Sequence, residues 1–105
     1  LIIDIRLHLT EKTMIKPRLS EIANNYSLIL CDIWGVVHKG NNIFPDALNT
    51  LLAYLDAGGD ICLITNAPRR SEIIRDYLLN MGVERNICNN IVSSGDCSYS
   101  WLSSI

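Results

Sequence analysis

One short run of residues constrains this chain more than any other: four apolar side chains that lead into a single carboxylate. It reads Leu28-Ile29-Leu30-Cys31-Asp32, and Gly35 follows three positions later. A short apolar run that is bounded by turn residues predicts a buried strand, here Ser27 to Ile33. Ligand crevices in open α/β sheets lie beyond the carboxyl ends of the strands, which makes Asp32 a candidate site residue.

Two interpretations of Asp32 are open from the strand pattern. An ionised carboxylate is costly to bury unless something pairs with it, and a metal ion or a reacting phosphate is one such partner. The alternative is a carboxylate at the strand end that only caps the next turn.

The rest of the chain alternates predicted strands with predicted helices. Apolar runs predict two further strands, over 60–65 and 90–93. Apolar residues at helical spacing predict three helices, which run from Pro45 to the stop at Gly58-Gly59, over 71–80, and from Cys97 to the end. This order implies a parallel sheet with right-handed crossovers. We therefore expect an α/β fold, a Rossmann-like three-stranded parallel sheet with flanking helices.

A second feature separates the first strand from the first helix. Residues 34–44 contain Gly35, Gly40 and an Asn-Asn pair around the apolar Val36-Val37. Turn residues around a short apolar piece predict a small hairpin, which we call the flap (residues 34–44).

Composition excludes several classes of partner. The 105 residues suffice for one small domain, and 49% hydrophobic with 19% charged residues is ordinary for a chain that forms a core. A net charge of −2 leaves no basic footprint, so we expect no nucleic-acid partner. No apolar run approaches the ~20 residues that span a bilayer, and the N-terminus lacks a signal-peptide layout, so we expect no membrane partner.

The cysteines indicate reduced thiols rather than a metal site. Cys31, Cys62, Cys88 and Cys97 show no CxxC spacing and no nearby histidine pair, which argues against zinc. Cys31 and Cys62 lie inside predicted strands, where a buried, reduced thiol is the ordinary state. We therefore expect a cytoplasmic protein.

The N-terminal residues fit poorly with this alternation of strands and helices. Leu1 to Leu9 alternate weakly and form at most a stray edge strand, and the first methionine is Met14. We expect residues 1–13 to be an extension outside the fold and residues 14–105 to form the domain. A short helix is predicted from Ser20 to Asn24.

Polar residues at the end of the second strand indicate an anion site. Asp32 and Thr65 end successive parallel strands, so both side chains can reach one crevice. Asn66 and the next backbone N–H groups precede a helix, and Arg69 or Arg70 adds a charged donor. A carboxylate nucleophile that faces such a site favours phosphoryl transfer through an aspartyl phosphate. The alternatives are that Thr65 only caps the helix entry and that one of the arginines is merely solvated.

Together these motifs resemble a haloacid dehalogenase-type hydrolase. The likeness rests on the strand with Asp32-Ile33-Trp34-Gly35-Val36, the flap, the loop Ile64 to Arg69, and the run Ser93-Ser94-Gly95-Asp96. It covers about Met14 to the C-terminus and is closest to subfamily IIA, which includes sugar-phosphate and nucleotide phosphatases.

The resemblance implies roles for individual residues. Asp32 would be the nucleophile and a Mg²⁺ ligand, and Trp34 would offer its backbone carbonyl to the same ion. Thr65 would bind the phosphoryl group with Asn66 beside it, and Arg69 is the charged donor that we assign to the phosphate. The implied substrate is a phosphorylated small molecule.

The chain departs from the family at the proton donor. Most of these phosphatases carry a second aspartate two residues after the nucleophile, as general acid and base. Here that position is Trp34, whose indole cannot transfer the proton, and such help is typically worth about 10²–10⁴-fold in rate. His38 or a substrate group would have to replace it, although we expect His38 to be an exposed loop histidine.

The second departure concerns the later motifs. The family continues with a cap domain, a lysine that steadies the nucleophile and an acidic motif that completes the Mg²⁺ site, and Lys12 and Lys39 lack the matching context. We therefore expect the N-terminal portion of such a hydrolase, inactive alone and completed by a C-terminal half-protein. The alternatives are a non-catalytic remnant and a small anion-binding module. Leu28 to Ile33 would then be an edge strand, which favours self-association, unless Leu1 to Leu9 fold back onto it.

Overall fold

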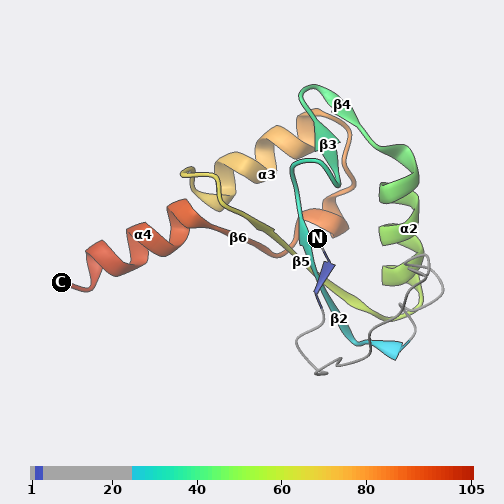
Figure 1. Cartoon of the computed structure of the whole chain (residues 1–105), viewed down its shortest axis with the longest axis horizontal. Helices are drawn as coiled ribbons and strands as arrows, with labels where there is room; N and C mark the ends of the chain where they lie inside the picture. Colours follow the sequence, from blue (N-terminus) through green and yellow to red (C-terminus); the bar gives the residue numbers. More distant parts are fainter. Residues whose placement is uncertain (1, 4–24) are drawn as a thin grey trace, which may run out of the picture.

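The computed structural model describes residues 2–3 and 25–105 of the chain (Figure 1). The predicted helix Ser20–Asn24, the residue Met14 and most of the predicted extension lie outside the described residues. The strands are β1 (Ile2–Ile3), β2 (Leu28–Asp32), β3 (His38–Lys39), β4 (Asn42–Ile43), β5 (Asp60–Thr65) and β6 (Ile91–Ser93). The helices are α2 (Pro45–Asp56), α3 (Ser71–Asn80), the 3₁₀ helix η2 (Arg85–Cys88) and α4 (Ser94–Ser103).

The described strands form one main sheet and one small hairpin. The main sheet has the order β1-β2-β5-β6, in which β2, β5 and β6 run parallel and β1 pairs antiparallel with β2. The predicted three-stranded parallel sheet with flanking helices is therefore confirmed. Two residues of the segment that we expected outside the fold, Ile2 and Ile3, pair with Cys31 and Leu30.

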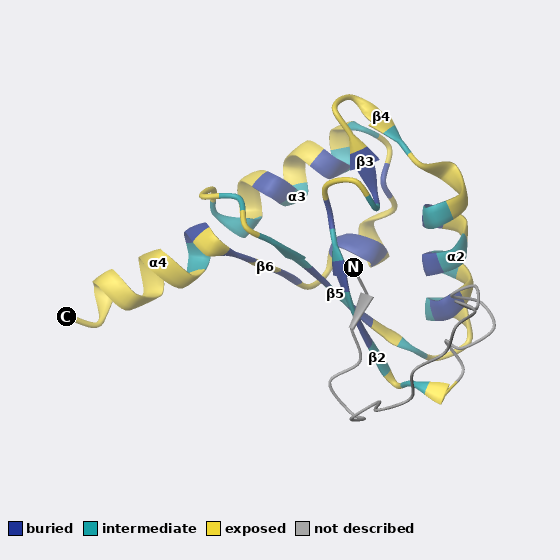
Figure 2. Cartoon of the chain, viewed as in Figure 1, coloured by how far each residue is buried: buried dark blue, intermediate teal, exposed yellow. Residues whose placement is uncertain are grey.

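One face of the main sheet forms the core. Along β2 the buried and half-buried residues alternate, because successive side chains of a strand point to opposite faces. Ile29 and Cys31 are buried beside Ile61 and Leu63 of β5, with which they are in register. The side chains that pack over this face come from α2, α3 and η2 and include Leu48, Leu51, Tyr54, Ile74, Leu78, Ile87 and Cys88. Figure 2 shows these buried segments converging on β2 and β5.

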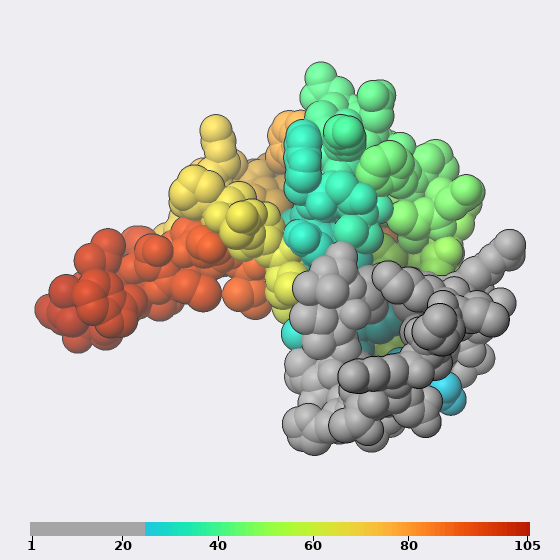
Figure 3. All heavy atoms as spheres, in the orientation of Figure 1, coloured from blue at the N-terminus to red at the C-terminus, as the bar shows by residue number. Residues whose placement is uncertain are grey.

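The alternation places Asp32 on the other face of the sheet. Leu28, Leu30 and Asp32 are half-buried, and Val92 of β6 on that side is exposed. Helix α4 leaves the sheet from the end of β6 and projects from the rest of the molecule (Figure 3). Asp32 is thus carried by β2, which lies between β1 and β5 in the sheet, and is half-buried at the carboxyl end of that strand.

The predicted flap is present as the antiparallel hairpin β3–β4. His38 pairs with Ile43, and Lys39 pairs with Asn42. Gly40 turns the hairpin with φ of +62°, and Gly35 has φ of +79°, a region that L-residues with a side chain rarely adopt. The two glycines explain how a chain that leaves β2 can fold back within a few residues.

The strands β2 and β6 are one residue shorter at one or both ends than predicted, and two larger differences have a local reason. The connection between α3 and β6, where no helix is predicted, contains η2, in which Ile87 and Cys88 are buried against the core. The last helix begins at Ser94 rather than Cys97, because the Ser93 hydroxyl accepts a hydrogen bond from the Asp96 N–H at 3.0 Å and so caps the helix. Both differences come from tertiary contacts or capping that apolar spacing does not report.

Among the residues that the structure describes, none of the helices combines the length and the apolar character that crossing a bilayer requires.

Candidate functional site

The candidate nucleophile lies at the end of β2. An Asp32 carboxylate oxygen, Oδ1, accepts a hydrogen bond from the N–H of Ile33 at 2.8 Å. This contact fixes the carboxylate against the backbone where the chain leaves the sheet. The bond goes to the adjacent residue and not two residues on, as in an Asx turn, so it orients the carboxylate at the strand end and leaves it half-buried.

A shallow hollow brings Asp32 together with Thr65 and Asn66, two of the three predicted phosphate-binding residues. It measures about 570 Å³ and lies over the carboxyl ends of the three parallel strands. The residues that line it are Asp32, Ile64, Thr65, Asn66, Val92, Ser93, Ser94, Cys97 and Ser98. We call it the carboxylate hollow. It joins a carboxylate to several hydroxyl groups and one amide, which suits a polar or ionic ligand.

Thr65 lies at the strand end, where the sequence predicts a phosphate ligand. Its Oγ1 accepts a hydrogen bond from the N–H of Ala67 at 3.2 Å. This bond shapes the loop after β5, whereas the residue at the N-cap of α3 is Arg70. A hydroxyl that accepts one bond retains its own hydrogen to donate, so Thr65 can shape the loop and still donate to an anion.

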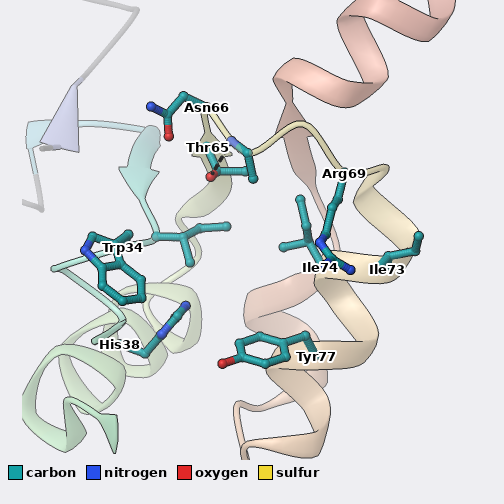
Figure 4. Close-up of a pocket in the computed structure, with 10 residues that line it drawn as sticks. Trp34, His38, Thr65, Asn66, Arg69, Ile73, Ile74 and Tyr77 are labelled. Carbon is teal, nitrogen blue, oxygen red and sulfur yellow. Dashed lines mark hydrogen bonds between the residues drawn. The ribbon is translucent and has the colours of Figure 1, made fainter. Parts of the chain in front are cut away.

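A second cavity lies between the flap and α3. It measures about 530 Å³ and is lined by Ile33, Trp34, His38, Thr65, Asn66, Ala67, Arg69, Ile73, Ile74 and Tyr77. We call it the aromatic cavity. Figure 4 shows Trp34 and His38 facing Tyr77 and Ile74 across it, with Thr65 and Asn66 at one end. Thr65 and Asn66 also line the carboxylate hollow, so the two spaces adjoin at these residues.

The expectation for His38 is wrong, because this histidine is buried. Only 6% of its surface is exposed. Its ring lies edge-on to Trp34, with 5.4 Å between centroids, and against Tyr77 at 5.7 Å. Its Nδ1 lies 3.0 Å from the carbonyl oxygen of Gly40, which can only accept, so Nδ1 carries the proton. The imidazole points into the aromatic cavity in Figure 4.

The two arginines of the loop have different surroundings. Arg70 donates from Nε to Oδ1 of Asp96 at 2.9 Å, and its guanidinium lies 3.8 Å from the centroid of the Tyr99 ring. Arg69 is exposed and lines the aromatic cavity. The structure therefore engages Arg70 in contacts with α4 and leaves Arg69, the residue assigned to the phosphate, beside the candidate site.

The first turn of α4 holds the loop 66–70 by several contacts that the sequence did not reveal. The Ser93 hydroxyl donates to the carbonyl oxygen of Arg69 at 2.6 Å, and the Gly95 N–H donates to that of Ala67 at 3.1 Å. A Cβ at Gly95 would lie 2.3 Å from the Arg69 carbonyl oxygen, so only glycine fits there. The Ser-Ser-Gly-Asp run is thus a support for the loop that precedes α3.

Asp96 completes this support. Its Oδ1 accepts from the Ser71 N–H at 3.1 Å, in addition to Arg70. Hydrogen bonds from the side chain and backbone of Ser71, and from Arg70, lower the pKa of Asp96. The carboxylate therefore stays ionised at neutral pH, where it holds the start of α3.

The fit to a magnesium ion is partial. Mg²⁺ prefers oxygen ligands, and Asp32 offers a carboxylate at an accessible strand end. Within residues 2–3 and 25–105 no group of three or more histidine, cysteine, aspartate or glutamate side chains could hold a metal ion. Asp32 is the one carboxylate among the residues that line the carboxylate hollow, and the Trp34 carbonyl is the second ligand that the motif implies.

Comparison with known proteins agrees with these motifs. A family model described as haloacid dehalogenase-like hydrolase matches residues 29–105. The fold is similar to that of a hydrolase of the haloacid dehalogenase-like family from Brucella suis 1330, with a TM-score of 0.79 and 32% identity over 88% of this chain. A hypothetical protein from Pyrococcus horikoshii OT3 shares the fold with a TM-score of 0.59 and 24% identity over 73% of this chain.

These matches differ from the chain in length. The chain spans 35% of the Brucella protein and 29% of the Pyrococcus protein. No curated protein matched the chain significantly. The matched structures share the fold of this chain, and the family model covers residues 29–105. That range includes Asp32, Trp34, Thr65 and Asn66.

Proposed function

Because the chain belongs to the haloacid dehalogenase-like hydrolases, we propose that it supplies the nucleophile and the phosphate-binding loop of a Mg²⁺-dependent phosphatase. The observation that carries this proposal is the carboxylate hollow, in which Asp32 shares one space with Thr65 and Asn66 at the carboxyl ends of adjacent strands. A carboxylate beside neutral donors suits attack on a phosphoryl group better than it suits binding of a free cation alone.

In the proposed reaction each side chain has one task. A carboxylate oxygen of Asp32 attacks the phosphorus of a phosphomonoester, the bond from phosphorus to the ester oxygen breaks, and that oxygen takes up a proton. Water then attacks the phosphorus of the aspartyl phosphate, which releases phosphate and a proton and restores the carboxylate. Thr65 and Asn66 donate hydrogen bonds to the phosphoryl oxygens, and Arg69 adds positive charge beside them.

Magnesium is the cofactor that the family implies. Asp32 and the backbone carbonyl of Trp34 would hold it, and when bound it would offset negative charge on the phosphoryl group. The proton for the leaving oxygen cannot come from the indole of Trp34. His38 has its Nδ1–H engaged with Gly40, so only its Nε2 could exchange a proton with a group in the aromatic cavity. Because the residues that the structure describes supply only part of a coordination sphere, we propose that this chain does not turn over substrate alone.

The carboxylate hollow also supports a second candidate, a small anion-binding module without catalysis. The loop 66–70 is held by Ser93, Gly95 and Asp96 rather than by Asp32. Phosphate could therefore bind to the loop whether or not Asp32 takes part. A cytoplasmic location suits both candidates, because Cys31, Cys62, Cys88 and Cys97 are free thiols.

Phosphate titration followed by backbone amide NMR separates the two candidates. We expect phosphate to shift the amides of Asn66 and Ala67, Mg²⁺ to tighten this binding, and Asp32→Asn to remove the Mg²⁺ effect. Asp60→Asn is the matched control, because Asp60 lies at the opposite end of β5. We also expect no turnover of p-nitrophenyl phosphate by the chain alone.

Each result of this titration has one meaning. Binding that ignores both Mg²⁺ and Asp32→Asn would establish the anion-binding module in place of the hydrolase. The absence of any amide shift at the loop would contradict both candidates. Turnover by the chain alone that Asp32→Asn abolishes would support the catalytic role and show that the chain needs no second half.

A further inference from the structure

We propose that the aromatic cavity receives the leaving group of the phosphoester, and that this leaving group is an aromatic ring. The inference rests on the proposed function, because it assigns the part of the substrate that lies beyond the phosphoryl group. It adds a substrate class to a site whose motifs specify only the phosphate.

The carboxylate hollow and the aromatic cavity adjoin at Thr65 and Asn66. The carboxylate hollow contains Asp32, the aromatic cavity contains Trp34 and Tyr77, and both are lined by Thr65 and Asn66. A phosphoryl group that contacts Thr65 and Asn66 would therefore lie where the two spaces adjoin. The ester oxygen, which lies opposite the attacking carboxylate in an in-line displacement, would then point into the aromatic cavity.

The wall of the aromatic cavity carries two large, exposed aromatic rings. Trp34 is 58% exposed and Tyr77 is 45% exposed, although both are large rings that border a cavity. Exposed aromatic side chains around a concave space are typical of a surface that binds an apolar group. The contact between Trp34 and His38 is edge-on, at 86° between the ring planes, so it covers only a small part of the indole. Ring surface is thus left for a ligand to stack on.

The polar side chains of Thr65 and Asn66 lie at one end of the aromatic cavity. Thr65 and Asn66 lie toward the strand ends in Figure 4, and Arg69 reaches down the opposite wall beside Ile74. The lower part of the cavity is bordered by Trp34, His38 and Tyr77. His38 already donates from Nδ1 to Gly40. The hydroxyl groups of a sugar would find few partners beside these rings and would lose their hydration, which costs free energy. An aromatic ring has no such groups to desolvate.

Contacts between α3 and the flap hold the walls of the aromatic cavity in place without a ligand. The Tyr77 hydroxyl lies 3.3 Å from the Gly40 carbonyl oxygen and 3.4 Å from Oδ1 of Asn41, both in the flap. The His38 ring contacts Tyr77 from the flap side as well. These contacts join the flap to α3, so the walls need not be ordered on binding. A volume of about 530 Å³ accommodates one ring system together with a phosphate.

Tryptophan fluorescence provides a direct test, because the chain has two tryptophans. In a Trp101→Phe background Trp34 is the only fluorophore of this kind. We would titrate this variant with phenylphosphonate, which resists hydrolysis, and with methylphosphonate and phenol. Phenylphosphonate is expected to bind about tenfold more tightly than methylphosphonate, since a stacked ring contributes about one decade in affinity. The matched control is Trp34→Phe with Trp101 as reporter, whose emission should stay constant.

Two variants assign the preference to its residues. Trp34→Ala and Tyr77→Leu are each expected to bring phenylphosphonate to within about twofold of methylphosphonate, while methylphosphonate binding, followed at the Asn66 amide, is retained. That retained binding shows that the variants remain folded. Thr65→Val should weaken both phosphonates equally.

The outcomes separate this inference from the proposed function. If both phosphonates bind with equal affinity and shift the Asn66 amide, the aromatic preference is wrong and the phosphate site stands. If neither shifts that amide, the phosphate site itself is wrong. If phenol binds as tightly as phenylphosphonate, the cavity is an apolar site unrelated to the phosphoester, and the inference is also overturned.

Discussion

Asp96 holds the guanidinium of Arg70 at 2.9 Å, across a separation of 26 residues in the chain. The same oxygen accepts the Ser71 N–H, so one carboxylate holds the residue before α3 and the first residue of that helix. Ser93 donates a hydrogen bond to the carbonyl oxygen of Arg69, and Gly95 donates one to that of Ala67. The start of α4 therefore fixes the conformation of the loop 66–70. The geometry of the loop 66–70 thus depends on a helix whose outer turns are exposed.

The first prediction concerns the pH dependence of this support. The pKa of Asp96 is lowered below its ordinary value of 3.8, first by the hydrogen bonds from Ser71 and then by that from Arg70. A carboxyl group with a depressed folded pKa stabilises the fold above its unfolded pKa, and this stabilisation is lost as the pH falls through the folded value. We therefore expect the wild-type Tm to exceed that of Asp96→Asn at pH 7, and the difference to shrink below pH 3.8.

The control for this comparison is Asp56→Asn, an exposed carboxylate at the end of α2. Thermal unfolding followed by circular dichroism at several pH values between 7 and 2 provides the measurement. A difference in Tm between wild type and Asp96→Asn that is independent of pH would show that the carboxylate charge has no part in the support.

The second prediction concerns Gly95. A methyl group there would lie 2.4 Å from the carbonyl oxygen of Pro68 and closer still to that of Arg69. Both contacts are with backbone, which cannot rotate away, so α4 and the loop must separate. We expect Gly95→Ala to lower the free energy of unfolding by about 1–3 kcal/mol, the usual range for overpacking. Urea denaturation is the measurement, and Ser94→Ala, at an exposed position in the same turn, should change it little.

The third prediction concerns the thiols. Burial raises the pKa of Cys31 to about 11, and burial also raises the pKa of Cys88. Cys97 is exposed on α4. Because the thiolate is the reactive form, we expect a disulfide reagent such as dithiobis-nitrobenzoate to label Cys97 first in the folded protein at pH 8. Mass spectrometry of the labelled peptides identifies the site, and labelling of Cys31 at a comparable rate would contradict the buried position of β2.

The sequence predicted elements well where the signal is local. The bounds of β5 and α3 match the predicted ranges 60–65 and 71–80. Each element has a clear apolar pattern, and glycine or a polar loop marks where that pattern ends. Gly82, just beyond the end of α3, has φ of +99°, the left-handed conformation that glycine commonly adopts after a helix. The strand end at Asp32 and the neighbouring end at Thr65 likewise follow from strand length and parallel order.

The features that the sequence did not reveal depend on pairs of distant residues. His38 contacts Tyr77, which is far away in sequence, and no pattern within the flap could predict that contact. The choice between Arg69 and Arg70 is determined by Asp96 in the same way. The aromatic cavity also needs α3 and the flap together. The sequence predicted Asp32, Thr65 and Asn66 of the carboxylate hollow, but neither the other residues that line it nor the cavity beside it.

The last prediction concerns the edge of β2. Ile2 and Ile3 pair with Cys31 and Leu30, which leaves Leu28 and Ile29 without a partner on that side among the described residues. An unpaired strand edge with apolar side chains offers N–H and C=O groups to another chain. Proline has no N–H and disfavours strand pairing, so an Ile2→Pro, Ile3→Pro double variant removes the pairing partner of β2. We expect this variant to self-associate more strongly than wild type.

Size-exclusion chromatography with light scattering measures the effect over a range of protein concentrations. The matched control is Ile105→Pro, which lies beyond the end of α4 and is 83% exposed, so it alters the chain without touching the sheet. The molar mass of the double variant is compared with that of the control at each concentration. A rise for the double variant alone would show that β1 protects the edge of β2 from pairing with another chain. Equal masses for all three proteins would mean that the edge of β2 does not recruit other chains, and that any association of this protein uses another surface.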